Sequence, residues 1–416
     1  MKIYKFYPWL VCLSAGLFFF YEFIQMTMLN SIGSEIMRSF SINTTQLGLL
    51  SSTYFVAIIL FYIPAGILID NFSNRILLCI AMSVSICGTI ILATTHSIII
   101  AGLSHFLSGI GHSFSFLIPL ILTSRWFPPH KKAFVMSIVI TVGMMGGIFA
   151  QTILTEITRM LGWRYALIAI AALGILFLFI IYLVVRDYPP NYVPEKKEGL
   201  LFHKTGQQCL TVIKNTNNWL CGIYASLLNL PIILLGAIWG LTYFEFNFYL
   251  SKRQASYVTS LLFVGAIIGT PLIGFLAGFF SRRKLMTYSA ILALICILLL
   301  IFQTNMSLIQ LSLLMLTLGI ITSAQVLSYP IVIEINPIKI IGTAVSFASL
   351  LIMSSGVIFQ PLFGYLIDQH SRYSAQGYSK ESFYYAMLIM PVSFFICILV
   401  SLLIKDTNHQ IIKSQS

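Results

Sequence analysis

Residues 76–124 read ILLCIAMSVSICGTIILATTHSIIIAGLSHFLSGIGHSFSFLIPLILTS and contain no Asp, Glu, Lys or Arg. A helix needs about 20 apolar residues to span a bilayer, so 49 residues are too many for one span. They fit two spans joined by a turn at Thr94–Ser97, where four polar residues interrupt the apolar pattern. The stretch therefore predicts a pair of membrane-spanning helices.

Long uncharged runs extend in both directions from this stretch. Of the 416 residues, 58% are hydrophobic and only 9% are charged, against about 25% in soluble domains. This composition excludes a soluble globular protein, a disordered chain and a collagen. The uncharged runs are 6–34 (broken only by Glu22), 39–69, 76–124, 133–155 and 165–185, and then 215–244, 254–281, 285–333, 340–367 and 382–404. Because 76–124 and 285–333 each hold two spans, we expect twelve.

The N-terminal run has a second interpretation. Lys2 and Lys5 before an apolar stretch are also typical of a signal peptide. The apolar stretch continues past Glu22 without a small-residue cleavage site, which favours a retained first helix.

The polar stretch 187–217 divides the chain into two halves. We predict a six-helix bundle over 1–186, a cytoplasmic linker over 187–217, a second six-helix bundle over 218–404 and a cytoplasmic tail over 405–416. With both termini inside, inner segments carry 17 of the 24 Lys and Arg residues and outer segments carry 7. This bias predicts cytoplasmic termini, and it explains the net charge of +12 without a nucleic-acid partner.

The two halves also align with each other at an offset near 208–210 residues. The matched pairs are Trp9 with Trp219, Gly66 with Gly274, Ser73 with Ser281, Arg75 with Arg283, Gly111 with Gly319, Pro129 with Pro337 and Lys131 with Lys339. A parallel repeat of two six-helix halves is typical of a transporter whose site lies near the membrane midplane.

The segment Gly66-Ile-Leu-Ile-Asp70-Asn-Phe-Ser-Asn-Arg75 resembles the G-x-L-x-D-x-x-G-[RK]-[RK] loop of the major facilitator superfamily. Further stretches are similar to the same family: Arg125–Pro128, Gly162–Arg164, Gly342–Ala344 and Gln360–Gly364. The resemblance implies an all-α membrane protein with twelve transmembrane helices in two pseudo-repeated six-helix bundles. It also implies a gating role for Gly66, Asp70, Arg75 and, in the second copy, Arg283.

Physical roles follow for the residues of this loop. Gly66 would permit a close helix approach, Asp70 would face the N-terminus of a neighbouring helix, and Arg75 would pair with a carboxylate. The copy departs from the family pattern because Ser73 replaces the second glycine, and the second-half copy lacks the aspartate.

Glu22 is the strongest candidate for a functional residue. It lies near the middle of the first span, where an ionisable group is costly and usually functional. His105 and His112 follow at i and i+7 on the fourth span, and His112 is expected at nearly the depth of Glu22. We predict proton coupling by Glu22, His105 and His112. A structural carboxylate and neutral histidines bonded to carbonyl groups are the alternatives.

Other polar or aromatic groups in the apolar runs are candidate substrate ligands. They are Tyr21, Gln25, His112, Gln151, Trp239, Tyr243, Gln325, Tyr329 and Gln360. Polar groups of this kind also join transmembrane helices, which is the more common role. Asn229 and Pro231 predict a break in the seventh span, which could free backbone groups for a ligand.

These patterns favour a secondary active transporter that moves a small organic solute by alternating access. Resemblance to bacterial branches of the family suggests proton-coupled symport of an amino acid, a short peptide or an organic acid. The alternative is a proton-coupled antiporter that exports a drug or metabolite, although 141–147 lacks the proline typical of such exporters. No nucleophile, metal or phosphate motif supports an enzyme. We expect no cofactor, a monomer, and a bacterial inner-membrane location.

Overall fold

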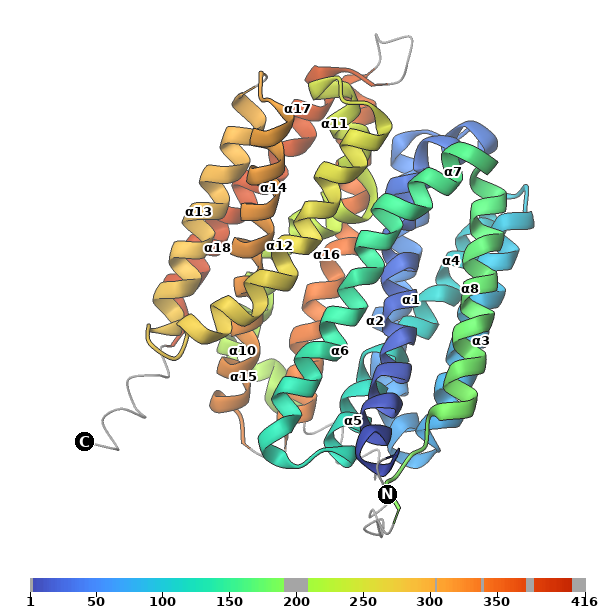
Figure 1. Ribbon diagram of the computed structural model, residues 1–416. Helices are drawn as coiled ribbons and strands as arrows, with labels where there is room; N and C mark the ends of the chain where they lie inside the picture. The colour runs from blue at the N-terminus through green and yellow to red at the C-terminus, as the bar shows by residue number, and fades with distance from the viewer. Residues whose placement is uncertain (1–2, 191–208, 304, 338–339, 372–377, 406–416) are drawn as a thin grey trace. The chain divides into compact units, whose positions relative to one another are not determined.

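The computed structural model describes residues 3–190, 209–303, 305–337, 340–371 and 378–405 (Figure 1). This part of the chain is helical and contains no strand. Twelve helical stretches in it are long and apolar enough to cross a membrane, six in each half, as the uncharged runs predict. The chain is therefore an all-α integral membrane protein. The turns predicted inside the two long runs are present, because α3 ends at Thr94 and α13 ends at Phe302.

Two compact units make up the chain, and residues 1–42 and 50–200 form the first. Its elements are α1 (Ile3–Phe40), α2 (Thr44–Asn71), α3 (Asn74–Thr94), α4 (Ile98–Ser115), α5 (Leu117–Trp126), α6 (Pro129–Phe149), η1 (Ala150–Leu154), α7 (Thr155–Leu161) and α8 (Trp163–Val184). Helix α1 packs against α6 and α8, and α3 packs against α4 and α8. This packing places one face of α1 inside the unit, which is where Glu22 lies.

The second unit comprises residues 43–49 and 201–416. Its elements are α10 (Thr216–Leu228), η2 (Pro231–Trp239), α11 (Gly240–Phe248), α12 (Lys252–Leu276), α13 (Arg282–Phe302), α14 (Leu308–Thr322), η3 (Ser323–Leu327), α15 (Ser328–Ile335), α16 (Ile341–His370), α17 (Lys380–Met387) and α18 (Ile389–Leu403). Its main helix pairs are α12 with α14, α10 with α16 and α13 with α18. Residues 191–208 of the predicted linker and 406–416 of the predicted tail lie outside the described residues.

The beginning of α2 belongs to the second unit because it is held by α16. The Asp368 carboxylate accepts hydrogen bonds from the backbone N–H groups of Thr44 at 3.2 Å and Thr45 at 2.8 Å, and from both of their hydroxyl groups. These N–H groups have no partner within the helix, so an acidic side chain at this end stabilises α2.

The seventh span is irregular at the place where Asn229 and Pro231 predict a break. Helix α10 ends at Leu228, and a nine-residue π-helical segment, η2, precedes α11. Both ends of this span are bonded to carbonyl groups of α13. The Tyr224 hydroxyl donates to Met286 O at 2.7 Å, and the Tyr243 hydroxyl donates to Leu300 O at 3.0 Å. A shorter π-helical segment, η1, interrupts the fifth span.

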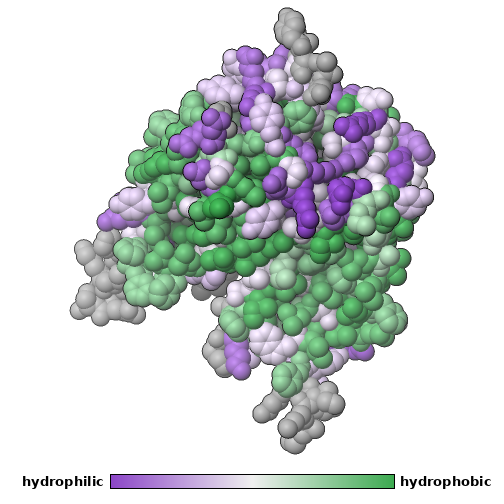
Figure 2. Space-filling model, turned by 45° about the horizontal axis from the view of Figure 1, so that its top comes forward, coloured by the Kyte–Doolittle hydropathy of each residue, from purple (hydrophilic) through white to green (hydrophobic). Residues whose placement is uncertain are grey.

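Matching serines begin the third helix of each half. The Ser73 hydroxyl accepts a bond from the N–H of Ile76, and the Ser281 hydroxyl accepts one from the N–H of Lys284, both at 3.4 Å. The serine that replaces a family glycine thus serves as an N-cap in both copies of the repeat. Apolar side chains cover the sides of the helices, and hydrophilic side chains gather at the helix ends turned toward the viewer (Figure 2).

Candidate functional site

Glu22, near the middle of α1, is the only fully buried Asp, Glu, Lys or Arg among the residues that the structure describes. Two hydroxyl groups donate to its carboxylate. Ser85 of α3 bonds Oε1, and Tyr54 of α2 bonds Oε2 at 3.1 Å. No basic side chain pairs with Glu22 in the described part of the chain. A carboxylate without a cation is costly to ionise inside a membrane, so Glu22 is suited to binding a proton.

Two glycines of α4 bring the neighbouring helices close enough for these bonds. A methyl group added at Gly109 would lie 2.2 Å from Tyr54 O, and one added at Gly111 would lie 1.9 Å from Ser85 Oγ and 3.0 Å from Glu22 Oε1. Such separations are far below van der Waals contact, so no larger residue fits without moving a neighbour. The two glycines therefore set the position of the groups around Glu22.

Tyr54 joins Glu22 to a histidine. Its hydroxyl lies 2.9 Å from His112 Nδ1 and 3.0 Å from Glu22 O. Its ring stacks on His105 with centroids 5.2 Å apart, and His105 Nδ1 is buried without a partner. The structure thus brings together the three residues predicted to couple protons, with Tyr54 between them.

A second group of hydrogen bonds lies one turn further along α1. Gln25 donates to the Thr89 hydroxyl at 2.8 Å and accepts from the Ser108 hydroxyl at 3.3 Å. The Tyr21 hydroxyl lies 2.9 Å from the same threonine oxygen. Tyr21 and Gln25 are fully buried, so this arrangement could offer ligand contacts only after a change of conformation.

Gln151 lies apart from this cluster, in the π-helical segment η1. Its amide oxygen accepts a bond of 2.6 Å from Asn30, and both side chains are buried. The adjacent Ser31 hydroxyl donates to Ala150 O at 2.6 Å and accepts from Thr155. In this conformation Gln151 therefore joins η1 to α1.

In the second unit, three candidate ligands are bonded to neighbouring helices. Gln325 donates to Asn229 Oδ1 at 2.9 Å, which connects η3 to the end of α10. The Tyr329 hydroxyl lies 3.2 Å from the Ser349 hydroxyl of α16. Gln360 donates to Ile233 O in η2 at 2.9 Å.

Two buried groups in this unit have unused hydrogen-bonding capacity. Trp239 Nε1 and Gln360 Oε1 are both buried and have no partner. The Trp239 ring stacks on Phe363, one turn beyond Gln360 on α16, with centroids 5.9 Å apart. An unsatisfied buried polar atom costs about 1–3 kcal/mol, so these atoms are natural contacts for a ligand.

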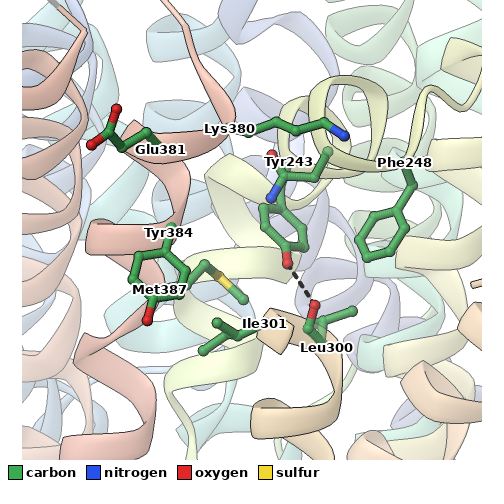
Figure 3. A pocket seen from close by; sticks show the side chains of 9 residues that line it. Tyr243, Phe248, Leu300, Ile301, Lys380, Glu381, Tyr384 and Met387 are labelled. Carbon is green, nitrogen blue, oxygen red and sulfur yellow. Dashed lines mark hydrogen bonds between the residues drawn. The ribbon is translucent and has the colours of Figure 1, made fainter. Parts of the chain in front are cut away.

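Tyr243 lines a cavity of about 220 Å³ in the second unit. Figure 3 shows the side chains that surround it. The lining residues come from α11, α13 and α17: Tyr243, Asn247, Phe248, Leu300, Ile301, Lys380, Glu381, Tyr384 and Met387. Asn247 Oδ1 is buried there without a partner. The Tyr243 hydroxyl itself points to Leu300 O, and Lys380 lies 4.4 Å from the ring centroid of Tyr249.

The predicted gating residues are placed as follows. Arg75 pairs its guanidinium with no carboxylate among the described side chains, and the expected pairing stays a prediction. Its guanidinium donates to Tyr182 O at 2.6 and 3.1 Å, because carbonyl groups in the last turn of α8 lack helical partners. Asp187 instead bonds the backbone N–H of Arg75 at 2.8 Å. The guanidinium also lies over the Tyr182 ring.

A methyl group added at Gly66 would meet nothing within 4 Å among the described residues. The close helix approach expected of Gly66 stays a prediction. Arg283 lies in the first turn of α13 and is partly exposed. The Asp70 side chain lies outside the described residues. The gating role of this motif stays a prediction.

Two members of the Glu22 cluster escaped the sequence analysis. Tyr54 and Ser85 are single hydroxyl residues in apolar runs, and nothing in their local spacing distinguishes them. The available signal is depth: a hydroxyl residue on α2 or α3 that lies at the depth of Glu22 could face it. No group of three or more His, Cys, Asp or Glu side chains that could hold a metal ion occurs in the described part of the chain.

The chain is similar to known membrane transporters in both sequence and fold. The family model for the Major Facilitator Superfamily matches residues 14–251 and 230–415. The "Hexuronate transporter" of Bacillus subtilis is 20% identical over 372 residues, which are 85% of this chain and 86% of that protein. The "Probable sugar efflux transporter" of Haemophilus influenzae is 28% identical over 204 residues, or 48% of each protein.

This chain thus spans about half the length of that efflux relative, and another curated relative matches over only 33% of its length. A crystal structure of a bacterial homolog to the human lysosomal transporter Spinster, inward-facing and occupied, has a TM-score of 0.76. It is 18% identical and covers 97% of both chains, so it shows likeness of fold.

Proposed function

This chain belongs to the Major Facilitator Superfamily, and from that premise we propose that it is a proton-coupled symporter of a small organic acid. It is a secondary transporter and not an enzyme. Alternating access would expose its substrate site to each side of the membrane in turn.

The observation that carries the proposal is the buried carboxylate of Glu22. It is hydrogen-bonded by Tyr54 and Ser85 and has no cation among the described residues. Binding a proton removes the charge, whereas losing it leaves an ion in a low-dielectric interior. The protonated and ionised forms would therefore favour different conformations, which is what coupling requires.

The similarity to a hexuronate transporter supports an organic acid over an amino acid or a peptide. The first unit offers hydroxyl, amide and imidazole groups at Tyr21, Gln25 and His112, and the second offers the unused groups of Trp239 and Gln360. No Lys or Arg is buried in the described part of either unit. The substrate carboxylate would thus be balanced by the co-transported proton rather than by a fixed cation.

Proteoliposomes that contain a pH-sensitive dye test this proposal. Hexuronates, other organic acids, amino acids and dipeptides are added outside, and acidification of the lumen is recorded for wild type and Glu22→Gln. Solute-driven acidification with organic acids, lost in Glu22→Gln, is the expected result. Glu156→Gln is the matched control, because Glu156 is partly exposed and pairs with Arg159 at 2.7 Å. Unchanged acidification in Glu22→Gln would refute the role of Glu22.

A second function is favoured by the efflux relative: proton-coupled antiport that exports a drug or metabolite. It predicts the opposite sign in the same assay, because an antiporter would exchange the entering solute for protons that leave, and the lumen would become alkaline. The direction of the pH change therefore separates the two functions.

We place both termini in the cytoplasm and the protein, as a monomer, in a bacterial inner membrane. The excess of Lys and Arg in the segments that this topology puts inside supports the orientation. Cytoplasmic and periplasmic reporter domains fused after Ser416 test it, since only a cytoplasmic reporter should be active.

A further inference from the structure

We infer that Tyr54 and His112 form a proton wire to Glu22, with His112 Nε2 as the atom that receives the proton. This inference rests on the proposed role of Glu22 as the proton carrier. The Tyr54 hydroxyl has one proton but lies within hydrogen-bond distance of Glu22 Oε2, Glu22 O and His112 Nδ1. A hydroxyl donates one bond and accepts two, so its direction of donation must depend on its neighbours.

With Glu22 ionised, the Tyr54 hydroxyl donates to Oε2, because a hydrogen bond to a charged acceptor is the stronger one. The hydroxyl oxygen then accepts a bond from Nδ1–H of His112. Nε2 of that neutral imidazole carries no proton and is an acceptor.

A proton that arrives at Nε2 can reach Glu22 without any heavy atom moving. The Nδ1 proton passes to the Tyr54 oxygen, and the Tyr54 proton passes to Glu22 Oε2. Tyr54 and His112 each gain one proton and lose one, so both end neutral. The net result is that the entering proton neutralises the Glu22 carboxylate. The histidine has changed from the Nδ1–H to the Nε2–H tautomer, and its Nε2 has become a donor.

The other route to the carboxylate is less favourable. A proton placed on Oε1 would have to turn the Ser85 hydroxyl toward its second acceptor, Ser108 O, which is 3.5 Å away. Tyr54 has its second acceptor, His112 Nδ1, at 2.9 Å. Hydrogen bonds weaken beyond about 3.2 Å, so the Tyr54 side is the better path.

The other ionisable groups near Glu22 do not offer a competing path. From α1, Tyr21 bonds Thr89, and from α4, His105 stacks on the Tyr54 ring without a bond from its Nδ1. Helix α3 contributes the neutral Ser85, and no bond joins Glu22 to α6 or α8 among the described residues.

The wire links proton binding to the chemistry of the solute. A donor at Nε2 favours a solute group that accepts a hydrogen bond, such as a carboxylate or carbonyl oxygen. His112 keeps 4% of its surface exposed, whereas Glu22 and Tyr54 keep none. Solute with an acceptor group should therefore bind more tightly to the form in which Glu22 is protonated.

Nitrogen-15 NMR of histidine-labelled protein in lipid nanodiscs tests the wire, because each ring nitrogen reports whether it carries a proton. The His112 signals are assigned by their loss in His112→Gln. In wild type we expect Nδ1–H at high pH and Nε2–H at low pH, with the change following solute-driven proton uptake. Glu22→Gln should hold Nε2–H at every pH, since its amide N–H donates to Tyr54 as a protonated carboxyl group does.

Tyr54→Phe should abolish the tautomer change and slow proton uptake at least about tenfold, while its ring keeps the stack on His105. Tyr62→Phe, on the same helix, should leave both unchanged. The wire is overturned if the His112 tautomer of wild type does not change with pH. It is also overturned if the tautomer changes with pH equally in wild type and in Tyr54→Phe. If Glu22→Gln stops proton movement while the wild-type tautomer stays fixed, only the wire fails. Proton movement that persists in Glu22→Gln refutes the proposed function itself.

Discussion

Removal of one hydroxyl group should shift the pH dependence of transport by an amount that the structure sets. Ser85→Ala deletes the donor to Glu22 Oε1 without disturbing the bond from Tyr54. A hydrogen bond contributes about 1.5–3 kcal/mol with a charged partner and about 1 kcal/mol with a neutral one. The ionised carboxylate therefore loses about 1 kcal/mol more than the protonated one. Since 1.36 kcal/mol corresponds to one pH unit, the shift is about 0.7 unit.

The sign follows from which form is stabilised. Ser85 favours the ionised form, so its loss lets Glu22 hold its proton to a higher pH. The pH at which uptake is half-maximal should rise by about 0.7 unit, and uptake should persist where wild type is inactive.

Uptake of labelled solute into proteoliposomes at a series of external pH values, at fixed membrane potential, measures this midpoint. Ser83→Ala is the matched control, because the Ser83 hydroxyl donates to Cys79 O within α3 and does not contact Glu22. An unchanged or lower midpoint in Ser85→Ala, or an equal rise in Ser83→Ala, would refute the reasoning.

Three further predictions concern packing, capping and substrate contact. Gly109→Ala should sharply reduce the yield of folded protein, because the added methyl would lie 2.2 Å from Tyr54 O. Gly66→Ala, where the methyl meets nothing within 4 Å, should be tolerated. Size-exclusion profiles of the two detergent-solubilised variants measure the yield of folded protein. Asp368→Ala should lower the free energy of unfolding by about 2 kcal/mol, since N–H groups at the start of α2 lose their acceptor, and a thermal melt that matches wild type would contradict this. Trp239→Phe should weaken solute binding about fivefold to tenfold, because it removes the indole N–H and keeps the ring stacked on Phe363. Wild-type affinity of this variant in calorimetry would show that the indole N–H does not contact the solute.

The positions of the twelve spans follow from the sequence because a membrane excludes charge. Arg38, Asp70 and Arg75 each lie at or near a helix end, so the uncharged runs between them delimit the helices. The irregularity of the seventh span was also predictable. Pro231 has no backbone N–H, so it cannot donate the helical hydrogen bond to the preceding turn. Ser73 and Ser281 are matched in the internal repeat, and both are N-caps in the structure.

The site was only partly predictable, because its partners come from other helices. Glu22 is visible as a lone carboxylate in an apolar run, and His112 as a histidine at the matching depth. Tyr54 is the residue that joins them, and a tyrosine among apolar neighbours gives no local sign of what its hydroxyl contacts. Likewise, nothing near Gln151 indicates that Asn30 would be its partner. The sequence also does not reveal that Arg75 bonds Tyr182 O, because a guanidinium can donate to the carbonyl groups at a helix end as well as to carboxylates.

The seventh span is bonded to α13 at two points and is π-helical between them. Tyr224 and Tyr243 tie it to α13, and the wide turns of η2 lie between these two attachments. A π-helical turn holds one residue more than an α-helical turn, and such turns often occur at functional sites. If that extra residue passes along the helix, each side chain it passes swings by roughly 100° while both ends stay still. Such a shift would re-aim Trp239, the last residue of η2, without unwinding the span.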